Sequence, residues 1–587
     1  MVGNHLSKSF HNRTLTVLIF AVFLPALIII GRLFYLQIIK GDYYAKLVLA
    51  KSYVEVPTQP ERGIIYFKDD INKGITPVAI NKVYYTLYLD PTLLVEGNEN
   101  DLTSKIKLYF PTIEETKIKG CFSKLNSQYC PLLSKIDDYD SVNKLKAEKI
   151  KSINFDNEKV RYYPLNELAS QVIGFLQENN TTTKLEGVYG LEKYYNNILT
   201  GVSGFFKGTK SGLNAIIRSI PNDEQVVVAG SSLIVSIDKN VQFKTEQELK
   251  NMVEEKEAES GSAIIMESNT GRIVAMANYP SFNPNEYFKI KDYNLFRNNT
   301  VENRYELGSV MKVLTMSAGL DSGKIKEAST YKDDHRATLN NKTIGNYGNH
   351  FYGLVDMKEI MSKSINMGAV YIEQQIGGSL LRDYFKNFGL DSKTGIDLPN
   401  EVSGDLKNID RREAREIDFA TASYGQGIAT TPIEMVRAMS AITNGGKMVN
   451  PYILESTKNS DGSLQSAHGD IEDAVSIISP ETAEKIKSMM VYTVETGYGQ
   501  RAKVDGYKSG GKTGTAMMFI DGEYSDTDNI HSFIGFFPVE TPKYIIYTVL
   551  KKPQIGLSAE STAAVLWHNL AAYLVSYYNI PPDDISS

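Results

Sequence analysis

The sequence predicts an α+β protein whose C-terminal half is an antiparallel sheet flanked by helices. The stretch from Gly261 to Asn278 reads as strand, Asn-Thr-Gly turn and strand, and a second hairpin is predicted from His531 to Leu550. Apolar helical stretches lie between the two hairpins, from Met311 to Leu320 and from Thr431 to Asn444. Hairpins at both ends with helices between them indicate an antiparallel sheet covered by helices.

Length and composition exclude several classes of protein. The chain has 587 residues, which suggests two or three folded units, and its 42% apolar and 22% charged residues are typical of globular domains. A net charge of −6 without a strongly basic domain argues against nucleic acid as a partner. The seven histidines and two cysteines have no zinc-binding spacing, so neither a metal site nor a cofactor is predicted.

The two cysteines, Cys121 and Cys130, lie in a highly charged stretch between Asn98 and Asn157. They do not form a C-x-x-C pair. Two interpretations stay open: two unrelated thiols, or one local disulfide if this region lies outside the cytosol.

One apolar segment is long enough to cross a bilayer. Leu15 to Gly31 carries no charge, and the apolar character resumes after Arg32 as LFYLQII. A cleaved signal peptide is the alternative, but no small-x-small cleavage site follows, so a retained anchor at 15–39 is predicted. Basic residues flank both sides and leave the orientation weakly specified: Lys8, Arg13, Arg32, Lys40, Lys46 and Lys51.

The remaining chain divides into two regions. Residues 40–225 mix short strand-like pieces with Lys/Glu/Asp-rich helical pieces, which is typical of a platform or partner-binding domain. The stretch VVVAGSSLIV, Val226 to Val235, reads as strands around a turn and opens a second domain at 226–580. A cytoplasmic tail at 1–14 and a short C-terminal tail at 581–587 complete the predicted organisation.

Serine-based acyl transfer is indicated by three motifs, each of which is weak alone. A nucleophilic serine needs a nearby base and donors for the oxyanion, and S-x-x-K on a helix places a lysine amine beside a serine hydroxyl. The motif recurs at Ser141/Lys144, Ser309/Lys312, Ser329/Lys332 and Ser509/Lys512. S-x-N recurs at Ser152/Asn154, Ser281/Asn283 and Ser364/Asn366, and K-T-G begins at both Lys393 and Lys512.

Order and context select one set from these copies. Ser309 follows Gly308 at the head of an apolar-periodic helix, KSINMG places Ser364 and Asn366 later, and SGGKTGTAMMF places Lys512 before a strand-like run. In this order the motifs match the three-part set of penicillin-binding proteins and class A β-lactamases.

Nearly the whole chain resembles class B penicillin-binding proteins. The resemblance lies in five further segments: Thr58 to Asp69, Gly187 to Gly201, Leu233 to Gln242, Ser423 to Ala438 and Ser532 to Lys543. It implies an anchor, a mixed platform (dimerisation) domain at 40–225, and a transpeptidase domain of the penicillin-binding/β-lactamase-like kind at 226–580. The first K-T-G, at Lys393, matches a structural turn of the family and is set aside.

The resemblance also implies a role for each motif residue. Ser309 would be the nucleophile and Lys312 its base, and Ser364 would relay a proton to the leaving D-alanine amine. Asn366 would hold the substrate amide and steady Lys312, and Lys512 would attract the donor carboxylate. Substrate would also be bound along the strand by Thr513, Gly514 and Thr515, with the backbone amides of Ser309 and Thr515 as the oxyanion hole.

Two positions depart from the family pattern. Leu307 stands where the family usually has proline, and Ile365 replaces a more common small or polar residue. Neither side chain takes part in the implied chemistry, so the departures concern only local geometry.

The resemblance implies a serine D,D-transpeptidase in the cytoplasmic membrane, with its catalytic domain outside, that cross-links peptidoglycan stem peptides and binds β-lactams covalently. No glycan-polymerising domain is expected. The implied partners are therefore a separate membrane glycan polymerase and proteins of a division or elongation complex.

Four alternatives compete with this function. A D,D-carboxypeptidase differs only in using water as acceptor, and a β-lactamase or β-lactam sensor would not need the platform. A non-catalytic division scaffold would not need all three motifs. Gly506 to Thr513, GYKSGGKT, also satisfies the phosphate-binding loop pattern, but such a loop should follow a buried strand and open a helix. Here the upstream residues are polar and the downstream residues read as a strand.

Overall fold

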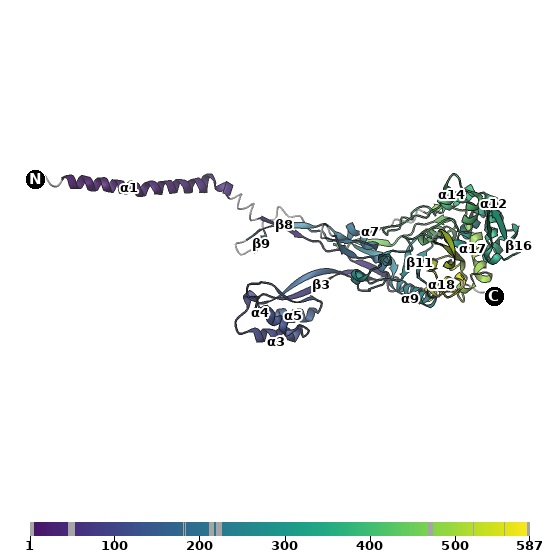
Figure 1. The fold of residues 1–587 in the computed structure, drawn as a ribbon, viewed down its shortest axis with the longest axis horizontal. Helices are drawn as coiled ribbons and strands as arrows, with labels where there is room; N and C mark the ends of the chain where they lie inside the picture. The colour runs from purple at the N-terminus through teal and green to yellow at the C-terminus, as the bar shows by residue number, and fades with distance from the viewer. Residues whose placement is uncertain are drawn as a thin grey trace. The chain divides into compact units, whose positions relative to one another are not determined.

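The computed structural model describes residues 5–44, 53–179, 181, 184–210, 216–218, 226–467, 474–520, 522–556 and 558–583 (Figure 1). The chain forms two compact units. One consists of Met1–Glu61 with Gly201–Ala229, and the other of Arg62–Thr200 with Gly230–Ser587.

The first unit contains the apolar helix. Helix α1, His5–Phe34, is extended by a π-helical turn at Tyr35–Ile39, and the apolar span Leu15–Ile39 has a mean hydropathy of 2.6 with none of it buried. At 1.5 Å per residue such a span measures ~37 Å, enough for a hydrocarbon layer of about 30 Å. The unit also holds a three-stranded antiparallel sheet of β1 (Tyr53–Thr58), β8 (Gly204–Lys210) and β9 (Ile216–Arg218).

A five-stranded antiparallel sheet forms the centre of the second unit, in the order β12-β11-β23-β22-β21. The strands are β11 (Ser260–Glu267), β12 (Ile273–Tyr279), β21 (Gly510–Ile520), β22 (Glu523–Phe537) and β23 (Tyr544–Lys551). Both predicted hairpins are confirmed, as β11–β12 and β22–β23. Neighbours such as Ile264 and Ile265 belong to separate hydrophobic clusters, because successive side chains of a strand point to opposite faces.

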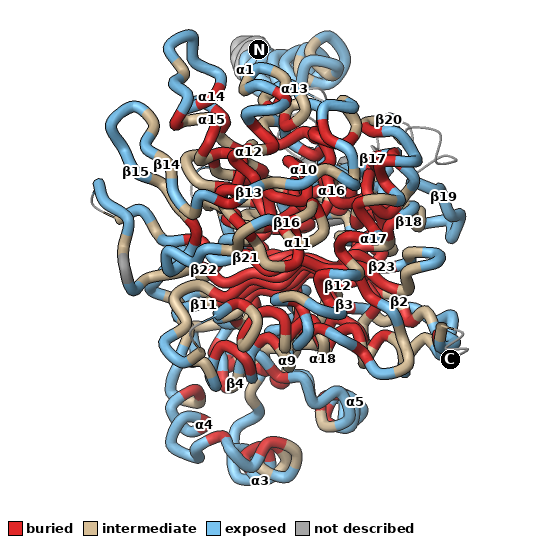
Figure 2. The backbone as a smooth tube through the Cα atoms, turned by 90° about the vertical axis from the view of Figure 1, so that its right-hand side faces the viewer, coloured by how far each residue is buried: buried red, intermediate tan, exposed pale blue. Residues whose placement is uncertain are grey.

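Helices cover both faces of this sheet (Figure 2). Helices α9 (Lys239–Glu255) and α18 (Ala563–Tyr577) pack on one face, and α16 (Pro432–Thr443) and α17 (Pro480–Thr496) contact strands of the same sheet within the other cluster. Helix α16 begins with a capping box, in which Thr431 and Glu434 satisfy each other's backbone N–H groups. The helices predicted around 311–320 and 431–444 are confirmed as α10 (Lys312–Asp321) and α16, and with them the α+β class.

The remaining helices of this domain are α11 (Met357–Ser362), α12 (Asn366–Ile376), α13 (Gly378–Asn387), α14 (Lys407–Asp410) and α15 (Glu416–Ala422). Short antiparallel pairs join β6 (Leu176–Glu178) to β7 (Leu185–Gly187), β13 (Thr330–Lys332) to β16 (Leu354–Asp356), β14 (Arg336–Leu339) to β15 (Lys342–Gly345), and β17 (Lys447–Met448) to β20 (Val475–Ser476).

A second sheet combines strands from both sides of residue 225, in the order β19-β18-β10-β2-β3-β4, with β5 also paired to β3. Its strands are β2 (Ile65–Asp69), β3 (Gly74–Leu89), β4 (Cys130–Ile136), β5 (Ile153–Tyr162), β10 (Ser232–Asp238), β18 (Leu454–Lys458) and β19 (Leu464–Ser466). Strands β2 and β10 pair in parallel. In the stretch expected to form strands around a turn, β10 begins at Ser232, and Val228 forms an isolated bridge to Val202. The domain boundaries of the sequence analysis stay predictions.

Two landmark segments of the N-terminal region meet at a buried carboxylate. Glu192, in α7 (Gly190–Tyr194), is fully buried and pairs with Arg62 at 2.6 Å and Arg161 at 2.6 Å. Burial alone would raise the pKa of Glu192, but the two guanidinium groups outweigh burial and hold that pKa below its usual value. Because a buried charge is costly without its partners, this cluster holds together segments that are 130 residues apart.

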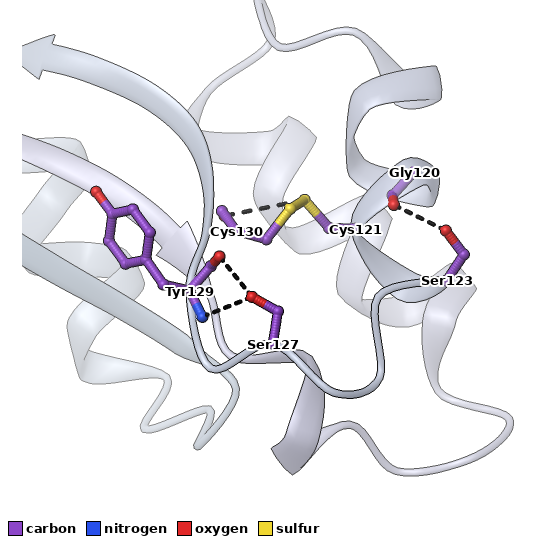
Figure 3. The surroundings of a disulfide bond; sticks show 6 residues. All are labelled: Gly120, Cys121, Ser123, Ser127, Tyr129 and Cys130. Carbon is purple, nitrogen blue, oxygen red and sulfur yellow. Dashed lines mark hydrogen bonds between the residues drawn. A yellow bond between two sulfur atoms is a disulfide. The ribbon is translucent and has the colours of Figure 1, made fainter.

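A small lobe around its own hydrophobic cluster contains both cysteines. Its helices are α3 (Glu99–Tyr109), α4 (Glu115–Phe122) and α5 (Tyr139–Ala147), which pack with β3, β4 and β5. Cys121 at the end of α4 and Cys130 at the start of β4 form a disulfide (Figure 3). In the loop between them, Ser127 Oγ donates to the Tyr129 carbonyl. Of the two interpretations of these cysteines, the structure has the local disulfide.

We expect the disulfide to stabilise this α3–α5 lobe. Protein denatured without reductant should show neither Cys121 nor Cys130 alkylated, by peptide mass spectrometry. Reduction should lower the local stability by about 2–4 kcal/mol, because the crosslink restricts the unfolded chain. Amide hydrogen exchange in α4 and β4 measures this change. A Cys121→Ser, Cys130→Ser variant is the control, since reductant should not affect it. Two freely alkylated thiols in native protein would contradict the expectation.

Candidate active site

Ser309 lies in the first turn of a helix, and this turn packs against the edge of the central sheet. It is the second residue of the 3₁₀ turn Gly308–Met311, which continues directly into α10. The N–H groups of a first turn have no acceptor within the helix, so the Ser309 N–H is available to a ligand. The turn contacts β21, an edge strand that pairs only with β22 among the described strands.

Three glycines allow the backbone segments around Ser309 to approach closely. A Cβ on Gly308, whose φ is +57°, would lie 2.5 Å from the Thr515 carbonyl oxygen, and one on Gly514 would lie 2.7 Å from the Leu307 carbonyl oxygen. A Cβ on Gly425 would lie 2.1 Å from the Gly308 carbonyl oxygen. Side chains at these positions would therefore separate β21, the serine turn and the loop after α15. Gly514, which was expected to bind substrate, therefore lies on β21 directly against the serine turn.

Lys312 is almost fully buried beneath Ser309. Its Nζ lies 2.9 Å from Ser309 Oγ, 2.5 Å from the Ser364 carbonyl oxygen and 2.6 Å from Asn366 Oδ1. Burial, and then the charge of Lys512, hold the pKa of Lys312 well below its usual range. The two carbonyl oxygens can accept both protons of a neutral amine. The amine lone pair is then free to accept the Ser309 hydroxyl proton.

A second buried lysine reaches the same site from the sheet. Lys512 of β21 is fully buried, and its Nζ donates to Ser364 Oγ at 2.9 Å and to the Thr513 carbonyl at 3.0 Å. Burial lowers the pKa of Lys512 to about 7. Ser364 Oγ lies 3.2 Å from Lys312 Nζ as well, so one hydroxyl bridges both amines. The geometry allows a proton to pass between the two lysines through this hydroxyl.

The backbone at Ser364 is strained. Ser364 follows α11 with a φ of +54°, and its N–H donates to the Met361 carbonyl while the Ile365 N–H donates to the Ile360 carbonyl. This pair of bonds is a Schellman motif, in which the left-handed position is usually occupied by glycine. A serine here costs roughly 1–2 kcal/mol in backbone energy. The left-handed turn presents both the carbonyl and the hydroxyl of Ser364 to Lys312.

The other predicted residues lie at the start of α12 and on β21. Asn366 is the first residue of α12, and its Nδ2 donates to the Gly345 carbonyl at 3.0 Å. On β21, Thr513 is buried beside Lys512 and Thr515 is exposed. The structure therefore brings together all the residues that the motifs selected, from three distant parts of the chain.

The other copies of the motifs lie elsewhere. Lys144, Lys332 and Lys393 are exposed. Ser509 is buried, but it stands three residues before Lys512 where the chain enters β21, and residues three apart on a strand point to opposite faces. The phosphate-loop pattern ends inside β21, and Thr513 does not begin a helix, so the pattern lacks the helix N-terminus that it needs.

Sequence reasoning missed a carboxylate that links three segments of the site. Glu306 Oε1 accepts the Gly427 N–H at 3.0 Å and the Tyr524 hydroxyl at 3.0 Å, and burial raises the pKa of Glu306. It thereby ties the segment before Ser309 to the β21–β22 hairpin and to the loop after α15. In the sequence, Gly425 and Gly427 are recognisable only as part of the family segment that begins at Ser423. Their φ values of +86° and +76° explain why Gly425 and Gly427 are glycines.

Comparison with known proteins gives two family matches. Residues 261–569 match the penicillin-binding protein transpeptidase domain, and residues 57–234 match the penicillin-binding protein dimerisation domain. The chain belongs to the class B penicillin-binding proteins. This family contains the peptidoglycan D,D-transpeptidases, and the dimerisation match at 57–234 overlaps most of the platform expected at 40–225 and extends past its predicted end.

Curated relatives align over most of the chain. It is 30% identical over 559 residues to stage V sporulation protein D of Bacillus subtilis (strain 168), covering 94% of this chain and 83% of that protein. It is 26% identical over 583 residues to a peptidoglycan D,D-transpeptidase FtsI homolog of Mesostigma viride, covering 94% of both.

Solved structures of penicillin-binding proteins have the same fold. Penicillin-binding protein 2X of Streptococcus thermophilus aligns with a TM-score of 0.77 at 20% identity, over 89% of this chain and 80% of that one. Penicillin-binding protein 3 of Mycobacterium tuberculosis, in complex with aztreonam, aligns with a TM-score of 0.68 at 23% identity, over 90% and 98% respectively.

The strain at Ser364 predicts a difference between two variants that both lose the hydroxyl. Ser364→Gly should be more stable than Ser364→Ala by about 1 kcal/mol, because glycine adopts the left-handed conformation without a Cβ penalty. Thermal unfolding of the two proteins side by side measures the difference. Equal stability, or a more stable alanine variant, would contradict the strain.

Proposed function

We propose that this penicillin-binding protein is a membrane-anchored serine D,D-transpeptidase that cross-links peptidoglycan stem peptides through an acyl-enzyme on Ser309. The supporting observation is the 2.9 Å contact between Ser309 Oγ and the buried amine of Lys312. The other close neighbours of that amine are oxygen atoms that can accept its protons. Such an amine is a general base in position for the serine hydroxyl.

In the proposed acylation, Lys312 takes the hydroxyl proton as Ser309 Oγ attacks the carbonyl carbon between the two terminal D-alanines. The oxyanion forms beside the backbone N–H groups of Ser309 and Thr515. When the intermediate collapses, the C–N bond breaks, and the departing D-alanine amine receives a proton through Ser364. An amine of a second stem peptide then attacks the ester carbonyl, and its proton passes through Ser364 to Lys312. Collapse breaks the bond between the carbonyl carbon and Ser309 Oγ, Lys312 returns the proton to that oxygen, and a new peptide bond remains.

Strand β21 provides the proposed binding surface. An edge strand has backbone N–H and C=O groups available on one side, so an extended stem peptide can add to it as a further strand. Lys512 would attract the donor carboxylate, with the hydroxyls of Thr513 and Thr515 as donors. Gly514 would contribute backbone only, since its Cβ position is filled.

The proposed location is the cytoplasmic membrane, with α1 as a single-pass anchor and the catalytic domain outside. The apolar span supports the anchor by length and composition. The Cys121–Cys130 disulfide supports an extracytoplasmic side, because such bonds persist in oxidising compartments. We assign no glycan polymerase activity to the chain. Its proposed partners are a separate membrane polymerase and proteins of a division or elongation complex.

We expect one stoichiometric penicilloyl adduct on Ser309, because a β-lactam resembles the acyl-D-alanyl-D-alanine end of a stem peptide. Ser309→Ala should abolish labelling, and Lys312→Ala should slow acylation by about 10²–10⁴-fold through loss of the base. Intact mass after incubation with benzylpenicillin, followed by peptide mapping, measures both.

Matched controls come from the other copies of the motifs. Ser141→Ala and Lys393→Ala should label like the unaltered protein, whereas Lys512→Ala should label slowly. Labelling that survives Ser309→Ala would refute the assignment. Rapid release of hydrolysed drug would keep the serine chemistry and indicate a β-lactamase instead.

Acylation should depend on pH through the two lysines. Lys512 is charged below its pKa of about 7 and neutral above it, so the second-order rate constant for benzylpenicillin should fall as the pH rises through about 7. Protonation of Lys312 should also reduce the rate toward the acid end, because burial, and then the charge of Lys512, lower its pKa well below the usual range and protonation removes the base. Stopped-flow acylation between pH 5 and 9 tests both limbs. Benzylpenicillin methyl ester, which lacks the carboxylate, is the control. The same alkaline decline with the ester would assign that limb to another group.

A further inference from the structure

The helix that bears Asn366 lacks a capping residue of its own. Helix α12 begins at Asn366, and its N-cap position is occupied by Ile365, whose side chain is fully buried and makes no capping bond. The N–H groups of a first turn need acceptors, and an N-cap side chain usually provides one to the second or third residue.

A side chain from a distant hairpin occupies the place of the missing cap. Asn346 follows strand β15 directly, is 5% exposed, and its Oδ1 accepts the N–H of Met367 at 3.0 Å. Met367 is the second residue of α12, one of the two that an N-cap side chain normally serves.

A buried carboxylate orients Asn346. The Nδ2 of Asn346 lies 3.1 Å and 2.9 Å from the two carboxylate oxygens of Asp333, and 3.0 Å from the His350 carbonyl oxygen. Asp333 is fully buried and also accepts the backbone N–H groups of His335 and Tyr352. If the amide were flipped, its oxygen would face a carboxylate. Asp333 therefore keeps the oxygen of Asn346 directed at α12.

The same hairpin also holds the side chain of Asn366. The Gly345 carbonyl accepts Asn366 Nδ2 at 3.0 Å, which directs Asn366 Oδ1 to Lys312 Nζ at 2.6 Å. Gly345 and Asn346 are adjacent, so a shift of Asn346 moves both contacts with the start of α12.

We propose that Asn346, oriented by Asp333, is a positioning residue that replaces the N-cap of α12 and holds Asn366 against Lys312. The proposal rests on the proposed function of Ser309 and Lys312. It assigns to Asn346 an effect on acylation that is exerted only through Asn366.

The test is a double-mutant cycle in the full-length protein, read as the rate of benzylpenicillin acylation well below the unfolding temperature. Asn346→Ala should slow acylation by about tenfold, the size expected for a lost cap. Asn366→Ala should slow it more, and adding Asn346→Ala to Asn366→Ala should have no further effect on the rate. General structural damage would instead multiply the two effects. The exposed residue Lys342 on β15 provides the control, and Lys342→Ala should acylate normally.

A milder variant guards against misfolding. Asp333→Asn keeps the size of the side chain but replaces one acceptor oxygen with an N–H donor, so Asn346 should be oriented less firmly and acylation should slow. An unchanged rate in Asn346→Ala, multiplicative effects in the cycle, or an unchanged rate in Asp333→Asn would overturn the proposal. The failures are distinguishable: an unaltered protein that does not label at Ser309 contradicts the proposed function, whereas labelling with an unaffected Asn346→Ala contradicts only the positioning role.

Discussion

The structure depends on the burial of two lysine side chains against one serine hydroxyl. A buried ammonium group is costly, so burial shifts both lysines toward the neutral form, and each needs acceptors for the protons it keeps. Ser364 Oγ is the shared neighbour of Lys312 and Lys512, at 3.2 Å and 2.9 Å. Burial therefore favours a neutral amine on Lys312, and this amine lies 2.9 Å from Ser309 Oγ. Both pKa shifts depend on burial of the two amines, and that burial requires the surrounding packing.

The fold meets this requirement with contributions from three distant segments. Ser309 and Lys312 come from the turn before α10, Ser364 and Asn366 from the junction of α11 and α12, and Lys512 from the edge strand β21. Backbone proximity is made possible by Gly308, Gly425 and Gly514, where a Cβ would collide with neighbouring carbonyl oxygens. The arrangement costs backbone conformational energy at Ser364, which adopts a left-handed conformation. Strain of this kind persists where the surrounding structure over-determines it, as at many functional sites.

The N-terminal region of the second unit also contains a buried ionisable group, Glu192, whose role is structural. Glu192 is as deeply buried as Lys512, but it is surrounded by the guanidinium groups of Arg62 and Arg161, so its charged form is favoured. At Lys312 burial itself favours the neutral form, and the charge of Lys512 adds to that effect. Similar burial thus favours the charged form of Glu192, where two opposite charges offset it, and the neutral form of Lys312, where no opposite charge does.

The sequence by itself determined the hairpins, the helices around Met316 and Val436, the apolar span and the pairing of Ser309 with Lys312, because these depend on short spacings within one element. The order of the motifs, read as a family resemblance, also selected Ser364, Asn366 and Lys512. Only the tertiary structure decided how Lys512 and Ser364 meet, why Gly514 cannot have a side chain, and that Cys121 and Cys130 are joined. It also decided the contacts of Glu306 and Asn346, which lie in polar stretches without a recognisable pattern. Their partners are far away in the chain, and the spacing of residues along a sequence contains no information about contacts that only packing creates.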